Sequence, residues 1–530
     1  MSTAIEPEPA RTAHAGPRWG PALAGVVAAA VALAIGELAA ALLGTKSLVL
    51  AVGDVIVDEA PGSIAREAID TLGGRNKPTL ITSIVVVCLA LGAGLGIVAH
   101  RRRIAGPIGF MLFAALGVWA QASAEGGDVG LGLLAAWMAA VAGTVTLHFL
   151  LVQWDRSMHP TDRAAATLSD PRQPTPDRRA FLGWSGGMTA AAAILASGSR
   201  SVQGRSRAAE ARDELAARLE ASTPPSAGPT GLEAEVPGLT PLVQPNDRFY
   251  RIDTALFVPR VDPADWSLEI DGMVDRPLTF TLDELYDREL VERPVTLSCV
   301  SNEVGGTLVG NAVWRGIPLT ELLDEAGVHD GATQIVGRSV DGWDCGFPTE
   351  LAYDGREAMV ALTMNGEPLP INHGFPARLV VSGLYGYVSA TKWLQSITLT
   401  TWEDFDGYWI PRGWSKEGPV KTQSRIDVPG KGEELEAGTL AVAGVAWAPN
   451  LGIEQVEVQI DDDPWVAAEL GDEMSDDSWR QWVVSWDATP GDHVIRCRAT
   501  DGTGATQTDL RTSVDPNGAS GWHTIQVRVT

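Results

Sequence analysis

The chain has few cysteines and few basic residues, and both shortages narrow its function. Only four cysteines occur in 530 residues, and none of them stands in a CxxC, CxxCH or ferredoxin-type spacing. Iron–sulfur clusters and c-type haem need such spacings, so the sequence argues against both. The 40 Lys and Arg residues are outnumbered by 66 Asp and Glu, which gives a formal net charge of −26. We expect no nucleic-acid partner, because phosphate backbones are bound by Lys and Arg.

Apolar residues make up 45% of the chain and gather near its N-terminus. Four segments have the ~20 apolar residues that a bilayer crossing needs. A fifth is richer in Ala and Gly and, taken alone, is equally compatible with a buried helix. Residues 1–198 are therefore predicted to be an all-α transmembrane bundle of about five helices. The segments are Trp19–Leu43, Leu80–Ala99, Ile104–Ala122, Val129–Val152 and Ala180–Gly198.

Charged residues between these segments predict the topology. HRRR at His100–Arg103 and five arginines between residues 156 and 179 alternate with loops in which acidic residues dominate. The positive-inside rule places the arginine-rich loops and the N-terminus in the cytoplasm. A fifth crossing then carries the rest of the chain out, which predicts a multi-pass protein of the cell membrane with an extracytoplasmic catalytic domain.

The fifth segment begins with DRRAFLG, Asp177–Gly183, which resembles a twin-arginine export signal in an internal position. That route carries folded proteins, as a protein with an intracellularly made cofactor requires. The alternative is that Arg178 and Arg179 are ordinary cytoplasmic anchors.

Three regions are predicted after the membrane bundle. Residues 199–243 read as a linker, with a short helix and then a proline-rich tether, STPPSAGPTG. Residues 244–428 mix strands with short helices, two of which are predicted to begin at the N-caps Thr281 and Thr320; this pattern indicates an α+β domain. Residues 429–530 show alternating strands with turns about every ten residues, which is typical of a β-sandwich.

Cys299 lies in PVTLSCVSNEVGG, Pro294–Gly306, at the end of a predicted strand and before a turn with two glycines. A thiolate held there would suit a redox-active transition metal. Two alternatives stay open. Cys299 is a buried free thiol without chemistry, or it forms a disulfide with Cys345, in which case no metal is bound.

Three blocks of the chain resemble the sulfite-oxidase family of molybdopterin enzymes. The most specific signal is HGFPAR, followed by an apolar strand, YGY and a KW pair. The resemblance implies a Mo-molybdopterin cofactor, oxygen-atom transfer, and an immunoglobulin-like C-terminal domain through which the chain forms a homodimer. The blocks are Arg248–Gly272, the Cys299 segment continued to Val328, and Met364–Ile397 continued by YWIPRGW and by Lys421–Ile426.

The resemblance also implies the site residues. Cys299 matches the metal-ligating cysteine, while Arg251 and Tyr408 match catalytic positions near the metal. The remaining positions match cofactor contacts, with Arg378 and Lys392 offsetting the negative charge of the pterin's phosphate. These cofactor-binding residues are Tyr250, Arg251, Asp253, Thr254, Ser339, Asp341, His373, Arg378, Ser389, Ala390, Thr391 and Lys392.

One departure bears on the substrate. Sulfite oxidases carry an arginine five residues after the cysteine, where this chain has Val304 beside Glu303. Losing a cation and gaining a carboxylate weakens the case for a dianion, so a neutral sulfoxide fits at least as well as sulfite. The predicted function is two-electron oxygen-atom transfer on a small substrate with an unidentified electron carrier. The alternative is a membrane-anchored sensor or binding protein that kept the fold and lost the metal.

Overall fold

The structure is a computed structural model, and it describes residues 18–43, 45–60, 71, 76–123, 129–158, 178–204, 207–222 and 231–530. The chain folds as two compact units, Met1–Arg205 and Ser206–Thr530. Each unit is described by itself below.

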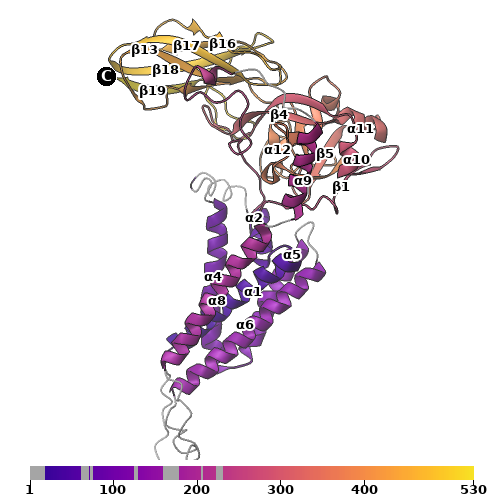
Figure 1. The fold of residues 1–530 in the computed structure, drawn as a ribbon, viewed down its shortest axis with the longest axis vertical. Helices are drawn as coiled ribbons and strands as arrows, with labels where there is room; N and C mark the ends of the chain where they lie inside the picture. The colour runs from indigo at the N-terminus through magenta and orange to yellow at the C-terminus, as the bar shows by residue number, and fades with distance from the viewer. Residues whose placement is uncertain are drawn as a thin grey trace, which may run out of the picture. The chain divides into compact units, whose positions relative to one another are not determined.

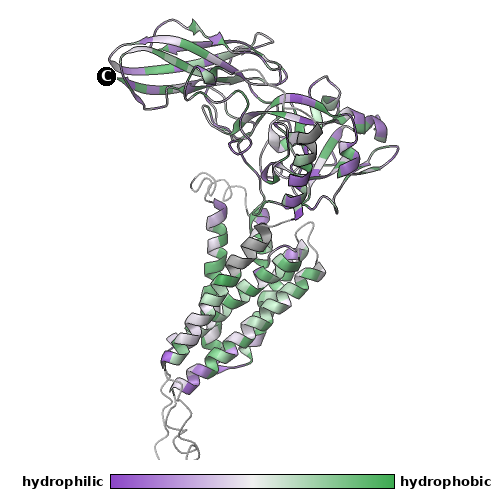
Figure 2. Cartoon of the chain, in the orientation of Figure 1, coloured by the Kyte–Doolittle hydropathy of each residue, from purple (hydrophilic) through white to green (hydrophobic). Residues whose placement is uncertain are grey.

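The first unit is a bundle of helices (Figure 1). Four of its helices are long and apolar enough to cross a membrane, as predicted, and apolar residues run along them (Figure 2). α1 packs against α4, α6 and α8. Large apolar side chains are exposed on the outside of other helices, such as Leu112 of α5 and Trp137 of α6, and this exposure fits contact with lipid. The helices are α1 (Trp19–Leu43), α2 (Leu48–Glu59), α4 (Asn76–Arg101), α5 (Ala105–Ser123), α6 (Val129–Met158) and α8 (Arg178–Gly204).

The fifth predicted crossing forms α8, which is not among the four helices that meet the length and composition of a membrane span. It nonetheless packs along the bundle through aromatic rings. Phe181 lies 5.2 Å from Trp154, and Trp184 lies 5.4 Å from Phe149. A fifth crossing stays a prediction. Arg178 and Arg179 open this helix, and Asp177 of the twin-arginine motif lies outside the described residues.

The second unit begins with α9 (Arg207–Ser222), which lies within the predicted linker. Arg212 of α9 donates to the carbonyl of Leu369 and to Glu367, so the helix is fastened to the domain that follows. Residues 231–243 include a short 3₁₀ turn, η2 (Leu232–Ala234), and are likewise held, since the carbonyl of Leu242 accepts from Trp479 Nε1 at 2.7 Å.

The domain that carries Cys299 contains two sheets around one core, with α10 (Leu282–Tyr286) and α11 (Leu319–Ala326) packed on it. One sheet has the order β2-β1-β10-β5-β6, in which β1 and β10 are parallel. The other has the order β3-β4-β7-β8, with β9 paired to β7. The strands are β1 (Ser267–Gly272), β2 (Leu278–Thr281), β3 (Val291–Ser298), β4 (Val309–Pro318), β5 (Gln334–Ser339), β6 (Asp344–Pro348), β7 (Ala358–Met364), β8 (Glu367–Pro368), β9 (Arg378–Val381) and β10 (Leu394–Thr400).

The C-terminal domain has two further sheets, of order β11-β13-β17-β16 and β12-β19-β18-β14-β15. Their inner faces share one core, in which Val442 and Trp482 of the first sheet meet Val456 and Ile495 of the second. The predicted two-sheet arrangement is therefore present (Figure 1). The strands are β11 (Gln423–Val428), β12 (Glu434–Leu435), β13 (Gly438–Trp447), β14 (Ile453–Ile460), β15 (Val466–Ala467), β16 (Glu469–Leu470), β17 (Arg480–Ala488), β18 (Gly491–Asp501) and β19 (His523–Val529).

Candidate functional site

Strand ends place the predicted site residues. Cys299 directly follows β3, Arg378 opens β9, and Lys392 stands two residues before β10. His373 ends a short 3₁₀ helix, η4 (Ile371–His373), while Ser389 ends α12 (Gly386–Ser389). Side chains at strand ends sit on rigid elements and project into connecting loops, where binding groups are commonly found.

Gly374 of the HGFPAR motif brings two of these segments together. Its φ of 115° is open to glycine but strained for other residues. A Cβ at this position would lie 3.1 Å from the Arg378 side chain and 3.2 Å from the Lys392 backbone. The amide of Trp393 also donates to the Gly374 carbonyl at 3.3 Å. Glycine therefore lets the Lys392 segment approach the start of β9 closely.

Cys299 is buried and free, as are Cys345 and Cys497, so the alternative disulfide is not formed. The thiol accepts from the amide of Ser301 at 3.4 Å. Burial raises the pKa of Cys299, while the Ser301 hydrogen bonds and the charge of Lys392 act in the opposite direction. A positive charge next to the thiol would stabilise its thiolate form once a metal is bound.

An ion-pair cluster whose Lys392 acts electrostatically on the thiol consists of the buried Asp253, the mostly buried Lys392 and the exposed Arg251. Asp253 is shared, since its carboxylate lies 2.7 Å from Arg251 Nε and 2.9 Å from Lys392 Nζ. Lys392 also donates to the carbonyl of Ile252 at 3.0 Å. Burial lowers the pKa of Lys392 to about 8, although Asp253 works against this shift. The predicted cofactor-binding residues Arg251 and Lys392 are thus joined through the Asp253 carboxylate.

Arg378 is 5% exposed, and among the described residues no carboxylate lies within ion-pair distance of it. Its guanidinium donates to the carbonyls of His373 at 3.2 Å and Leu379 at 3.4 Å and lies 4.9 Å from the Trp314 ring centre. Burial lowers its pKa to about 10. A buried cation whose partners are all neutral would be stabilised by a bound anion.

His373 is held neutral in this positive environment. Burial, followed by the charges of Arg378 and Lys392, lowers its pKa to about 4. Its Nε2 lies 3.0 Å from the carbonyl of Asn246, which can only accept, so Nε2 carries the proton and Nδ1 is left as an acceptor. The Phe249 ring packs edge-on against the imidazole at 5.6 Å.

The structure connects several further predicted residues to this cluster. Tyr250 stacks on Phe249, and the charges of both Cys299 and Arg378 act on its pKa, which burial raises. The Thr391 carbonyl accepts from Leu379 of β9 at 2.9 Å. Ser389 and Ala390 are buried in the same segment. Ser339 ends β5, and Asp341 lies in the turn that follows. Between them, the amide of Val340 donates to the Trp393 carbonyl at 2.9 Å.

Two predicted residues are placed less directly. Thr254 is half-buried beside Asp253. The amide of Tyr408 donates to the carboxylate of Asp344 at 3.0 Å, and its ring lies 3.7 Å from the Arg412 guanidinium. These interactions place Tyr408 next to the strand that carries Cys345, and none of them reaches Cys299. The catalytic part assigned to Tyr408 stays a prediction.

Sequence reasoning missed one neighbour of Cys299. Tyr385, the first tyrosine of YGY, is 4% exposed, and burial followed by the charge of Cys299 raises its pKa to about 12. The YGY motif contains two tyrosines that lie two residues apart. No local pattern in the sequence says which of them interacts with the thiol.

The C-terminal domain holds the loop after Cys299, which the sequence did not reveal. Arg425 donates to the carbonyl of Gly306 at 2.9 Å. A Cβ at Gly305 would lie 2.2 Å from the His523 ring. Both glycines belong to the SNEVGG turn, so residues more than 100 positions away shape the segment that presents the thiol.

Comparison with known proteins assigns this region to a family. Residues 255–409 match the model of the oxidoreductase molybdopterin binding domain. Residues 255–409 therefore form a molybdopterin-binding oxidoreductase domain. Its cofactor is molybdenum carried by molybdopterin. Cys299, Arg378 and Lys392 all lie inside the matched segment, which agrees with the resemblance found in the sequence.

The similar proteins are nitrate reductases and a sulfane dehydrogenase. Inducible nitrate reductase [NADH] 2 of Glycine max is 33% identical over 171 residues, which cover 27% of this chain and 19% of that protein. Nitrate reductase [NADH] 1 of Arabidopsis thaliana is 34% identical over 179 residues, covering 29% and 19%. The sulfane dehydrogenase SoxCD of Paracoccus pantotrophus is 23% identical, with a TM-score of 0.48, covering 54% of this chain and 81% of that one. The chain spans about a fifth of the length of these nitrate reductases.

The residues present fit this cofactor. Arg378 supplies a buried cation without a carboxylate, and the Gly374 approach leaves Lys392 beside it, as a phosphate group requires. Cys299 supplies one free thiol. Among the described residues no group of three or more His, Cys, Asp or Glu side chains gathers as a metal site. A metal on Cys299 would take its other ligands from the cofactor.

Proposed function

We propose that this protein is a membrane-anchored molybdenum oxidoreductase that transfers an oxygen atom to or from a small sulfite-like or sulfoxide-like substrate, with Cys299 as the protein ligand of the metal. The observation that carries the proposal is the free, buried thiol of Cys299 together with the cations Arg378 and Lys392, whose segments the close approach at Gly374 brings together. The bound cofactor would supply the two-electron change and the oxygen-atom exchange.

The chain's own residues would hold and shield that chemistry. Arg378, Lys392 and Arg251 would offset the phosphate charge, and Asp253 would keep the last two in place. Neutral His373 would present Nδ1 as an acceptor to a pterin N–H. The buried rings of Phe249 and Trp314 would keep water from His373 and Arg378, which strengthens the electrostatic interactions around these two residues. Tyr408 is proposed as a hydrogen-bond donor to the reacting oxygen.

The turn after Cys299 lacks the cation that suits sulfite. Glu303 is exposed and Val304 is half-buried in the turn after Cys299. The nearby Arg425 is occupied by Asp427 at 2.6 Å and by the Gly306 carbonyl. This arrangement favours a neutral sulfoxide over a dianion. The nitrate reductases among the relatives make nitrate a further anion to include in a screen.

The proposal places the catalytic unit outside the cell membrane and assigns the C-terminal domain an immunoglobulin-like fold that supports a homodimer. The apolar helices α1, α4, α5 and α6 support the anchor. The electron carrier is a separate protein or a small molecule.

Metal analysis with a substrate screen tests the proposal. The full chain, purified without oxygen, should contain about one molybdenum per chain and react with a sulfoxide, sulfite or nitrate in the presence of an artificial redox dye. Cys299→Ser should lower kcat more than ~100-fold, because loss of a partner that only supports a metal ligand already costs about 10–100-fold. The matched control, Cys497→Ala, removes a buried free thiol of the C-terminal domain and should keep both metal and activity. A metal-free wild-type protein of normal stability would instead support a sensor or binding protein.

A further inference from the structure

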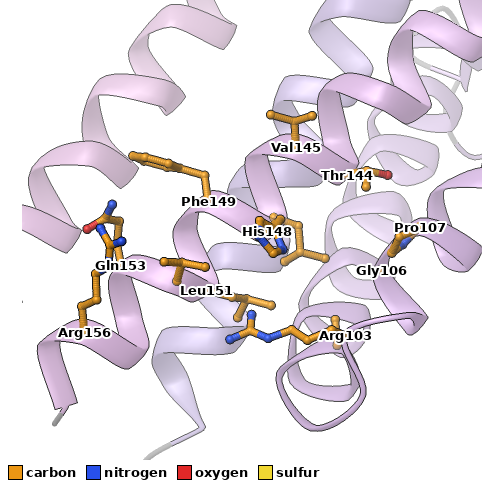
Figure 3. Close-up of a pocket in the computed structure, with 13 residues that line it drawn as sticks. Arg103, Gly106, Pro107, Thr144, Val145, His148, Phe149, Leu151, Gln153 and Arg156 are labelled. Carbon is orange, nitrogen blue, oxygen red and sulfur yellow. The ribbon is translucent and has the colours of Figure 1, made fainter. Parts of the chain in front are cut away.

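The first unit contains a cavity at the arginine-rich end of the helix bundle. It has a volume of about 520 Å³ and is bounded by the end of α4, the start of α5 and the last half of α6 (Figure 3). A volume of this size is typical of ligand-binding pockets. None of its residues belongs to the site around Cys299.

The lining of the cavity divides into a charged mouth and an apolar trough. Arg103, Arg156 and His148 are the ionisable members, and no Asp or Glu lines it. Val145, Leu151 and Phe149 form part of the trough. Figure 3 shows Arg103 reaching from the turn between α4 and α5 toward the face of α6 that carries His148 and Leu151.

The two arginines differ in their partners. Arg103 forms an ion pair with Asp155, which also lies 3.4 Å from His100. Arg156 is exposed, and no carboxylate of the described residues lies within ion-pair distance of it. Arg156 therefore gives the mouth a positive charge that no carboxylate of the described residues offsets. A neutral ligand would not use it, and a small soluble anion would leave the apolar trough empty.

We propose that this cavity binds an anionic phospholipid of the leaflet on the arginine-rich side. Its phosphate would lie between Arg103 and Arg156, and the first segments of its acyl chains would fill the trough. Basic pockets between transmembrane helices take anionic headgroups for the same reason. The lipid would tie α4, α5 and α6 together at the membrane surface. This proposal is independent of the chemistry at Cys299.

Lipid titration of the full, detergent-purified and delipidated chain tests the proposal. Native mass spectrometry should show dioleoylphosphatidylglycerol bound at least tenfold more tightly than dioleoylphosphatidylcholine. Arg156→Gln should weaken phosphatidylglycerol binding about fivefold, the effect of one cation near a membrane surface, without changing phosphatidylcholine binding. The matched control is Arg102→Gln, an exposed arginine of the same arginine cluster that does not line the cavity; it should bind as the parent does.

A second variant tests the trough separately. Val145→Trp keeps every charge, fills the space beside α6 and should lower phosphatidylglycerol binding at least fivefold. The proposal is overturned if the two lipids bind equally or if Arg102→Gln matches Arg156→Gln. It also fails if glycerol phosphate competes as well as the intact lipid, because a site for a soluble anion would then explain the charge.

Discussion

At the scale of single residues, the unpaired cation Arg378 separates a structural from a functional explanation. An arginine with a structural role stabilises the protein without its cofactor. An arginine that serves to bind an anion does not, because the free-energy cost of burying its charge is not offset until the anion is bound. Among the residues that the structure describes, the Arg378 guanidinium donates to two backbone carbonyls and lies on the Trp314 ring, and no carboxylate lies within ion-pair distance of it. Arg356, by contrast, is paired with Asp354 at 2.6 Å and reaches the Ser382 carbonyl at 3.0 Å.

The two arginines therefore form a matched pair of variants. In cofactor-free protein, Arg378→Met should leave the free energy of unfolding within about 1 kcal/mol of the parent or raise it. Its molybdenum content after expression should fall at least tenfold, the scale of one charge-assisted hydrogen bond to phosphate. Arg356→Met should show the reverse, with lower stability and normal metal. Urea unfolding and metal analysis measure both. Equal destabilisation with unchanged molybdenum would assign Arg378 a structural part.

His373 makes a prediction about pH. Its pKa is about 4 in the folded protein, against about 6.5 for a free histidine. Above pH 6.5 both states are neutral, and the histidine adds no pH dependence. Between pH 6.5 and 4 only the unfolded state takes up the proton, so the free energy of unfolding falls by up to about 1.4 kcal/mol per pH unit.

His523 contributes in the same direction, because burial and then Arg425 lower its pKa to about 4. Urea midpoints of the cofactor-free protein, measured from pH 7 to 4.5, should fall steeply in the parent. The fall should be shallower in His373→Gln and shallowest in His373→Gln/His523→Gln. A double variant with the parent's slope would show that other groups govern acid stability.

At the scale of elements, short sequence patterns predict those features that depend on residues close together in the chain. Thr281 caps α10 with a full capping box, in which Glu284 bonds back to the cap, as the TLDE spacing predicts. The second cap was wrong. α11 begins at Leu319 after Pro318, so Thr320 lies inside the helix and caps nothing. A proline fixes the φ that a helix start needs, and it overrode the Thr-Glu signal.

The site shows the same limit over longer distances. The sequence proposes Cys299, Arg378 and Lys392 as site residues because their motifs are short and continuous, and their parts in binding stay predictions. The bracing of Gly305 by His523 and of Gly306 by Arg425 could not, since it depends on how a second domain docks. No periodicity of either segment reveals that contact.

Gly305 tests this bracing. Its φ of +79° favours glycine, and a Cβ would also collide with the His523 ring. Gly305→Ala should lower the free energy of unfolding by about 2–4 kcal/mol, since backbone strain and overpacking add, and should lower kcat by displacing the Cys299 loop. The matched control is Gly355→Ala, with a φ of +96° but open space around it; it should show only the strain, about 1 kcal/mol, and normal kcat.

Adding His523→Ala to Gly305→Ala should recover part of both losses, because it removes the collision and leaves the strain. Urea unfolding and dye-linked turnover measure the series. If the two glycine variants behave alike, or if the second change recovers nothing, the C-terminal domain does not shape the loop.

At the scale of the whole molecule, the chain combines a helical unit, in which four of the described helices could cross a membrane, with a molybdopterin-binding domain that accounts for residues 255–409. Its similarity to the two nitrate reductases covers 27% and 29% of the chain. The Arg-rich ends of the helices predict which way the first unit inserts, and α8 then decides on which side the catalytic unit lies.

The arginine pair that opens α8 tests that topology. Replacing Arg178 and Arg179 by lysine keeps both positive charges, so the positive-inside signal is unchanged and only recognition of the arginines themselves is lost. If the pair is an export signal, the double lysine variant should keep its catalytic unit inside intact cells while still containing molybdenum, because the cofactor is inserted before export. Protease added to spheroplasts should digest the catalytic unit of the parent and spare that of the variant.

The control changes Arg101 and Arg102 to lysine at the end of α4 and should leave export intact. Equal digestion of all three proteins would instead make Arg178 and Arg179 ordinary cytoplasmic anchors, and protection of all three would place the catalytic unit in the cytoplasm.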